Sequence, residues 1–92
     1  MTVPVDVRFV AADAPHQHDG LLGWAQATID SLAVDGFTLH RTLRGRLVVT
    51  WPHRRGEDGR LYPVVEPVDA ATRQAVRAAV VAAWRTSGGT SP

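Results

Sequence analysis

The chain has no cysteine, no lysine and no long apolar run among its 92 residues. Without cysteine it can form neither disulfides nor thiolate metal sites, and nothing in it argues for secretion. No segment approaches the roughly 18 consecutive apolar residues that a membrane-spanning helix needs. The first eight residues also lack the basic leader and apolar stretch of a signal peptide. We therefore expect a cytoplasmic protein with no membrane partner.

Positive charge is concentrated in the middle of the chain. The whole sequence has a net charge of +1, which by itself implies no partner. Residues 1–36 contain five acids and one arginine, whereas residues 37–60 contain six arginines and two acids, a net charge of +4. A local excess of guanidinium groups is typical of a surface that binds phosphates or acidic groups.

Hydrophobic patterning predicts short strands over most of the chain and one helix at its end. The strand-like segments are residues 3–9, 21–29, 32–34, 37–42, 47–51 and 61–65. Strands followed by a helix indicate the α+β class: a small antiparallel sheet of about five strands with one C-terminal helix packed on it. The length is that of a single domain, assigned to residues 1–86, with residues 87–92 as a disordered tail.

Turn and capping residues refine this prediction. Asp30-Ser31 could turn the chain, and so could Asp35-Gly36, with residues 32–34 extended between these two pairs and residues 37–42 extended after them. Residues 53–60 are expected to be a polar loop closed by the turn pair Asp58-Gly59. Asp69 is expected to cap a helix over residues 70–84. The apolar stripe that should cover the sheet consists of Val76, Ala79, Val80, Ala83 and Trp84.

No pattern in the sequence indicates catalysis. Ser31, Asp35 and His40 are residue types of acyl-transfer triads, but neither a nucleophile elbow nor an oxyanion loop accompanies them. The glycines at positions 20 and 23 lack the lysine and hydroxyl residue of a phosphate-binding loop. We predict that the chain is not an enzyme and has no cofactor or small-molecule substrate.

A second candidate site is the histidine pair at residues 16 and 18. His16 and His18, with Asp13 and Asp19 beside them, have the residue types of metal ligands. Two imidazoles on a loop are fewer than the three or four ligands of a stable site. A solvated loop is the preferred interpretation, and no metal is predicted.

The most specific feature is the segment Pro52-His53-Arg54-Arg55, which Arg60 follows. Guanidinium forks on a loop between two strands can contact phosphates or guanine edges. His53 would bind a phosphate better when protonated. The alternative is a solvated turn in which Arg54 and Arg55 pair with the neighbouring acids. Trp51 is interpreted as a core residue because it continues the apolar face of residues 47 and 49.

A second basic element lies on the predicted helix. Arg73 and Arg77 are one helical turn apart and would extend a phosphate-binding patch. The alternative is that both simply point into solvent.

The order of these segments resembles the stage V sporulation protein G family. The resemblance is carried by Leu47-Val-Val-Thr-Trp-Pro-His-Arg-Arg55, the Asp58-Gly59 turn, Pro67-Val-Asp69 and Thr72-Arg73 ahead of the helix. In that family a hydrophobic strand runs into a Met-Pro-Ser-Arg-Lys-like motif, and a helix opening with Ser-Thr-Arg follows later. Here Trp51 stands in place of the Met and His53 in place of the Ser. The resemblance covers roughly residues 3 to 85.

The resemblance implies a homodimeric bacterial regulator that binds DNA, and in some members RNA, and that is linked to septation and sporulation. By that similarity Arg54 and Arg55 fall on the basic motif and Arg73 on the arginine at the helix start. The predicted nucleic-acid-binding residues are His53, Arg54, Arg55, Arg60, Arg73 and Arg77. The alternative function is a protein-interaction module of the cell-division machinery, whose basic segment docks on an acidic protein surface.

Overall fold

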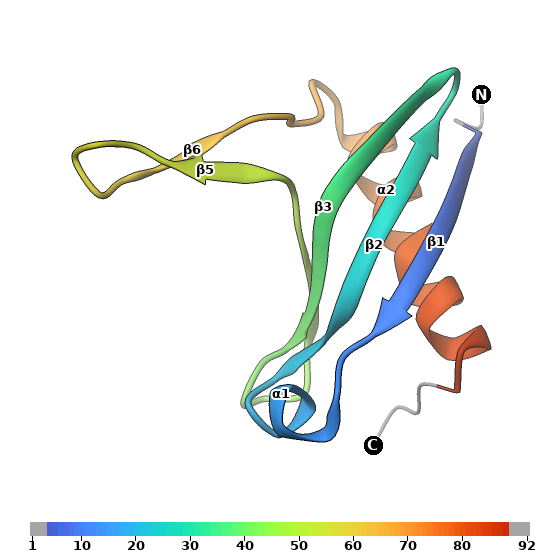
Figure 1. The fold of residues 1–92 in the computed structure, drawn as a ribbon. Helices are drawn as coiled ribbons and strands as arrows, with labels where there is room; N and C mark the ends of the chain where they lie inside the picture. Colours follow the sequence, from blue (N-terminus) through green and yellow to red (C-terminus); the bar gives the residue numbers. More distant parts are fainter. Residues whose placement is uncertain (1–3, 89–92) are drawn as a thin grey trace.

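The main sheet of the protein has four antiparallel strands, and a separate two-stranded ribbon projects from it (Figure 1). These elements are seen in a computed structural model that describes residues 4–88. The elements are β1 (Val5–Ala11), α1 (Ala14–His18), β2 (Leu21–Ile29), β3 (Leu32–Arg41), β4 (Leu47–Thr50), β5 (His53–Arg55), β6 (Leu61–Pro63) and α2 (Ala70–Thr86). The α+β class is confirmed. The expected sheet of about five strands is instead a sheet of four strands, in the order β1-β2-β3-β4, and a pair, β5-β6.

Strand β2 shows why the main sheet has one buried face. Ala25 and Ala27 are buried, Gln26 between them is half-buried, and Trp24 and Thr28 on either side are exposed, as expected for alternate side chains on a half-buried strand. The turn after β2 is at Asp30-Ser31, where Asp30 has a φ of 58°. The other candidate, Asp35-Gly36, lies inside β3 beside a register shift opposite β2. Gly36 has a φ of 100° there, which suits a β-bulge.

Helix α2 covers one face of the sheet. It begins where the sequence predicts, because the Asp69 carboxylate accepts a 2.7 Å hydrogen bond from the Thr72 N–H. This bond to the charged form lowers the pKa of Asp69 below its ordinary value. The helix buries Val76, Val80, Val81 and Trp84 in the core with Phe37 and Leu39 of β3. Ser87 caps its C-terminus, and residues 89–92 of the expected tail lie outside the described residues.

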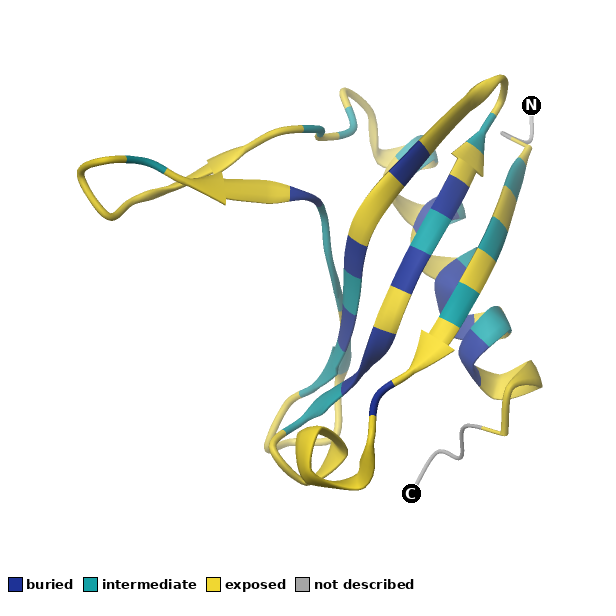
Figure 2. Cartoon of the chain, viewed as in Figure 1, coloured by how far each residue is buried: buried dark blue, intermediate teal, exposed yellow. Residues whose placement is uncertain are grey.

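The opposite face of the sheet carries no second layer within residues 4–88 (Figures 1 and 2). The short helix α1 contacts it at one end of β2. We call this surface the open face. Helix α1 was not predicted; the sequence suggested a loop there. Asp13 caps it by accepting from the His16 N–H at 3.1 Å, and Pro15 lies in its first turn.

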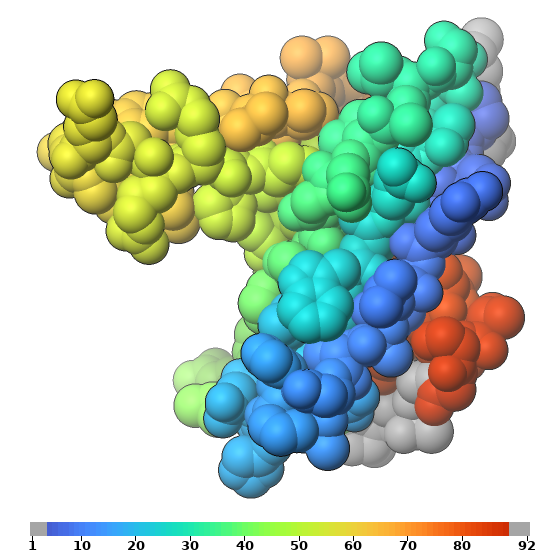
Figure 3. Space-filling model, viewed as in Figure 1, coloured from blue at the N-terminus to red at the C-terminus, as the bar shows by residue number. Residues whose placement is uncertain are grey.

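The ribbon of β5 and β6 stands clear of the body of the protein (Figures 1 and 3). Its base is held by a 3.0 Å hydrogen bond from the Val64 N–H to the Pro52 carbonyl. Its tip is closed by the Gly56 N–H, which donates to the Arg60 carbonyl at 2.8 Å. The expected polar loop over residues 53–60 is therefore wrong in its first part. His53, Arg54 and Arg55 form a strand, and only the turn around Asp58-Gly59 is as predicted.

Candidate nucleic-acid interface

The two arginines of the basic motif lie on opposite faces of the ribbon. In its register Arg54 pairs with Tyr62 and Arg55 pairs with Leu61. Successive side chains of a strand point to opposite faces, so these two pairs face in opposite directions. Arg60, which pairs with Gly56 at the tip, lies on the same face as Arg54. We call Arg54, Arg60 and Tyr62 the Arg54 face, and His53, Arg55 and Leu61 the Arg55 face.

The Arg54 face combines two guanidinium groups with an aromatic ring. The Arg54 guanidinium carbon lies 5.4 Å from the centroid of the Tyr62 ring, within the range of a cation–π contact. The Tyr62 hydroxyl donates a 2.5 Å hydrogen bond to Asp58 Oδ2, which fixes the ring across the turn. The ring also packs closely over Gly56, where an added Cβ would come within 2.5 Å of a ring carbon. A side chain at position 56 would therefore force this ring to shift.

This hydrogen bond shifts the titration of both partners. The Tyr62 hydroxyl and the Arg60 N–H, 3.0 Å from Asp58 Oδ1, stabilise the ionised carboxylate and lower the pKa of Asp58. The same bond to Asp58 raises the pKa of Tyr62, because it favours the protonated hydroxyl. At neutral pH the Asp58 carboxylate is therefore ionised and hydrogen-bonded to groups of the ribbon itself.

The Arg55 face is less available for a ligand. Arg55 Nη1 donates a 2.9 Å hydrogen bond to the Gly59 carbonyl, and His53 Nδ1 donates a 3.0 Å bond to the Trp51 carbonyl. Leu61, which is 57% exposed, gives this face an apolar patch. The Arg55 face therefore presents one guanidinium group to a ligand, whereas the Arg54 face presents two.

The arginines of the ribbon are not neutralised by the acids next to them. In the described part of the chain, no ion pair joins Arg54, Arg55 or Arg60 to Glu57 or Asp58. All strand residues of the ribbon are exposed. The internal ion pairs of the solvated-turn alternative are therefore absent from the described residues.

Arg73 and Arg77 lie apart from the ribbon, beside the free edge of β4. Arg77 Nη2 donates a 3.2 Å hydrogen bond to the Leu47 carbonyl. A groove of about 220 Å³ lies here, lined by Arg46, Leu47, Val48, Val49, Trp51, Arg73 and Arg77. The structure thus joins the two helix arginines to Arg46, which sequence reasoning did not select as a site residue. The only signal for Arg46 was its place in the basic middle segment.

Two other parts of the sequence prediction can be placed. Trp51 is half-buried, and its ring meets Phe37 edge-on with centroids 4.9 Å apart, so it is a core residue as expected. Arg41, another member of the basic segment, has its guanidinium carbon 5.5 Å from the centroid of the Trp84 ring. The arginines of the basic segment are therefore divided among the core edge, the turn between β3 and β4, the β4 groove and the ribbon.

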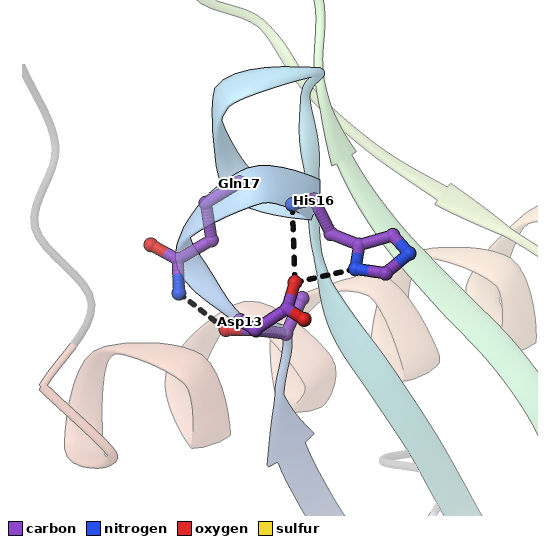
Figure 4. A network of polar contacts seen from close by, with 4 residues as sticks. Asp13, His16 and Gln17 are labelled. Carbon is purple, nitrogen blue, oxygen red and sulfur yellow. Dashed lines mark hydrogen bonds and ion pairs between the residues drawn. The ribbon is translucent and has the colours of Figure 1, made fainter.

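The histidine pair belongs to helix α1 (Figure 4). The His16 ring bonds the Asp13 carboxylate through Nδ1, and this bond lowers the pKa of Asp13. Gln17 Nε2 donates to the Ala12 carbonyl at 2.6 Å. Within residues 4–88, no three histidine, aspartate or glutamate side chains come together in an arrangement that could hold a metal ion.

Comparisons with known proteins add no identification. No protein-family model matches the chain, and no curated protein is significantly similar to it. The resemblance to the stage V sporulation protein G family therefore stays a prediction. Neither helix in the described residues is long and apolar enough to cross a membrane.

Proposed function

We propose that the protein is a nucleic-acid-binding regulator and that the β5–β6 ribbon is its contact arm. The observation that carries this proposal is the ribbon itself: it stands off the body, exposes its strand side chains and carries three arginines that no neighbouring acid pairs with. A two-stranded ribbon fits the major groove of duplex DNA, and exposed guanidiniums also bind the phosphates of single strands.

The Arg54 face is the better binding surface of the two. Two guanidiniums beside an exposed aromatic ring provide charge for the phosphate backbone and a flat surface for sugar or base contacts. The cation–π contact and the Asp58 hydrogen bond hold Arg54 and Tyr62 in place before binding. Less side-chain entropy is then lost on binding.

The groove with Arg46, Arg73 and Arg77 is a secondary positive surface in this proposal. It lies at the edge of β4, the strand from which the chain continues into the ribbon. A phosphate backbone leaving the ribbon would meet these arginines next. Their expected contribution is smaller, because Arg77 already donates to the Leu47 carbonyl.

The remaining parts of the proposal rest on the family resemblance and on size. We propose a cytoplasmic homodimer, since small domains often complete a thin core by association. The free edge of β4 leaves unpaired backbone groups with which a second copy could pair. A role in septation- or sporulation-type control is supported by the sequence resemblance alone.

Binding of labelled duplex and single-stranded oligonucleotides at two salt concentrations tests this function. The test variant replaces Arg54, Arg55 and Arg60 by glutamine, and the control replaces two exposed arginines elsewhere, Arg44 and Arg85. We expect the ribbon variant to lose most of its affinity and salt dependence, while the control retains most of both. Unchanged binding by a folded ribbon variant would refute the contact arm.

One observation favours the protein-interaction alternative. Leu61 and Val64, at and just beyond β6, are 57% and 58% exposed, and apolar side chains at these positions suit a protein partner. Leu61→Ser tests this alternative. It should leave nucleic-acid affinity unchanged if the Arg54 face is the contact. It should abolish partner binding if the ribbon docks on a protein.

A further inference from the structure

A tryptophan lies on the open face of the main sheet, where a core residue would not be expected. Trp24 is 41% exposed and occupies the middle of β2, with strands on both sides of it. Its ring is met edge-on by the His16 ring of α1, with centroids 5.9 Å apart and an interplanar angle of 69°. The edge contact holds the indole against the sheet and leaves ring surface exposed.

A hollow of about 250 Å³ lies beside this ring. Its lining is Arg8, Val10, Trp24, Ala25, Gln26 and Asp35. Arg8, Gln26 and Asp35 are successive neighbours across β1, β2 and β3, so they form one row of polar side chains next to the tryptophan. The row presents guanidinium donors, an amide that both donates and accepts, and a carboxylate acceptor.

We propose that this hollow is a nucleobase site, in which an unpaired base stacks on Trp24 and is hydrogen-bonded by Arg8, Gln26 and Asp35. This inference rests on the proposed function and deepens it: the ligand must contain a single-stranded segment. A base within a duplex is covered on both faces by its neighbours and cannot reach a flat protein surface. An aromatic ring on an antiparallel sheet, with polar groups beside it, suits an unstacked base.

The site is connected to the ribbon along the sheet. Trp24 pairs across the strands with Thr38, and Thr38 pairs with Thr50 near the end of β4. With strands about 4.8 Å apart, Trp24 is roughly 10 Å from Thr50. The ribbon begins at His53, three residues after Thr50. A single strand held by the ribbon can therefore reach the open face within a few nucleotides.

The composition of the open face favours a base over a second copy of the chain. Val10 and Val48 are exposed there, at 64% and 41%, but hydroxyl and imidazole groups lie between them. Thr38 Oγ1 and His40 Nε2 are 2.8 Å apart, and both face outward with Thr50. An interface between copies would have to satisfy these groups and the row of Arg8, Gln26 and Asp35.

The decisive variant is Trp24→Ala, measured with a 12-nucleotide single strand and with a duplex of the same sequence. Loss of one base–aromatic stack should weaken single-strand binding roughly 5- to 150-fold. The salt dependence should stay unchanged, because no charge is removed, and duplex binding should stay within about 2-fold. Thr28→Ala, on the same strand and face, is the matched control and should bind like the wild type.

Fluorescence gives a second readout that does not depend on the alanine variant folding well. Trp51 is half-buried and Trp84 is buried, so single-strand binding should quench mainly the emission of Trp24. This quenching should be lost in Trp24→Phe, which keeps a ring on the sheet.

Each outcome of these experiments decides between the two proposals. Trp24→Ala binding the single strand as tightly as the wild type would overturn the nucleobase site while leaving the ribbon proposal standing. If Trp24→Ala loses affinity while the variant with the ribbon arginines replaced by glutamine binds like the wild type, the base site is supported and the contact arm is refuted. If Trp24→Ala changes only the molecular mass in light scattering, the open face joins copies of the chain, and the base site is wrong. Absence of binding to either oligonucleotide refutes both proposals.

Discussion

Replacing Arg54 and Arg60 together by glutamine should reduce the free energy of nucleic-acid binding by more than twice the reduction caused by replacing Arg55 by glutamine. The reason is the register of the ribbon, which places Arg54 and Arg60 on one face with Tyr62 and places Arg55 on the other. Arg55 also has one donor engaged with the Gly59 carbonyl, whereas no hydrogen bond to a protein acceptor is found for Arg54 or Arg60 side chains in the described residues.

The size of the effect follows from counterion release. Each phosphate contact contributes about 0.9 to the slope of log K against log salt on duplex DNA, and about 0.7 on a single strand. The double variant should therefore reduce the slope by about 1.8 per chain on duplex DNA. Each lost contact should cost about 1 kcal/mol, so the pair should weaken binding roughly 30-fold. Arg55→Gln should change the slope by less than about 0.9.

Fluorescence anisotropy over a series of salt concentrations measures these slopes directly. Arg44→Gln with Arg85→Gln removes the same charge from exposed positions off the ribbon and should leave the slope nearly unchanged. Circular dichroism should show that all variants are folded, since none of these side chains lies in the core. Equal slopes for Arg55→Gln and the double variant would refute the assignment to one face. Equal slopes for the control and the double variant would show that binding is spread over the whole surface.

Three further predictions concern the titration, assembly and core of the protein. Tyr62 is the only tyrosine, so its ultraviolet absorbance should report a pKa raised above the ordinary value of tyrosine and shifted down by Asp58→Asn. Because the pKa is raised in the folded state, the stabilisation from this bond is present at lower pH and is lost as the pH rises through the folded pKa. An unshifted titration contradicts the hydrogen bond. Light scattering should return twice the 10.0 kDa chain mass, and a monomer across the micromolar range would exclude the proposed dimer. Leu39→Ala, at a fully buried position, should lower the free energy of unfolding by about 2–5 kcal/mol in urea titrations, and a loss below about 1 kcal/mol would contradict its place in the core.

The sequence predicted the structure well at two kinds of place: strands whose side chains alternate between core and solvent, and helix caps formed by residues close in the chain. The second predicted strand has the bounds of β2, and the helix begins directly after the Asp69 cap. Both depend on interactions within a few residues: the period of two that buries Ala25 and Ala27, and the carboxylate that accepts the Thr72 N–H. The single turn pair Asp58-Gly59 was also read correctly for the same reason.

The sequence pointed to the residues of the candidate site, but it did not predict how they are arranged in space. His53, Arg54 and Arg55 have no apolar alternation, because the ribbon buries neither of its faces, so periodicity could not identify β5 as a strand. Helix α1 is a single short element whose cap and proline resemble those of a loop.

The sequence by itself determined the strands of the main sheet in outline, the C-terminal helix with its cap at Asp69, and the residues that form the basic segment. Only the tertiary structure decided that Arg54 and Arg55 point in opposite directions, that Arg46 joins Arg73 and Arg77, and that Trp24 remains exposed. The physical reason is that these relations depend on pairing between distant segments. Strand register sets the direction of a side chain, and the side of the sheet that α2 covers determines which face stays open.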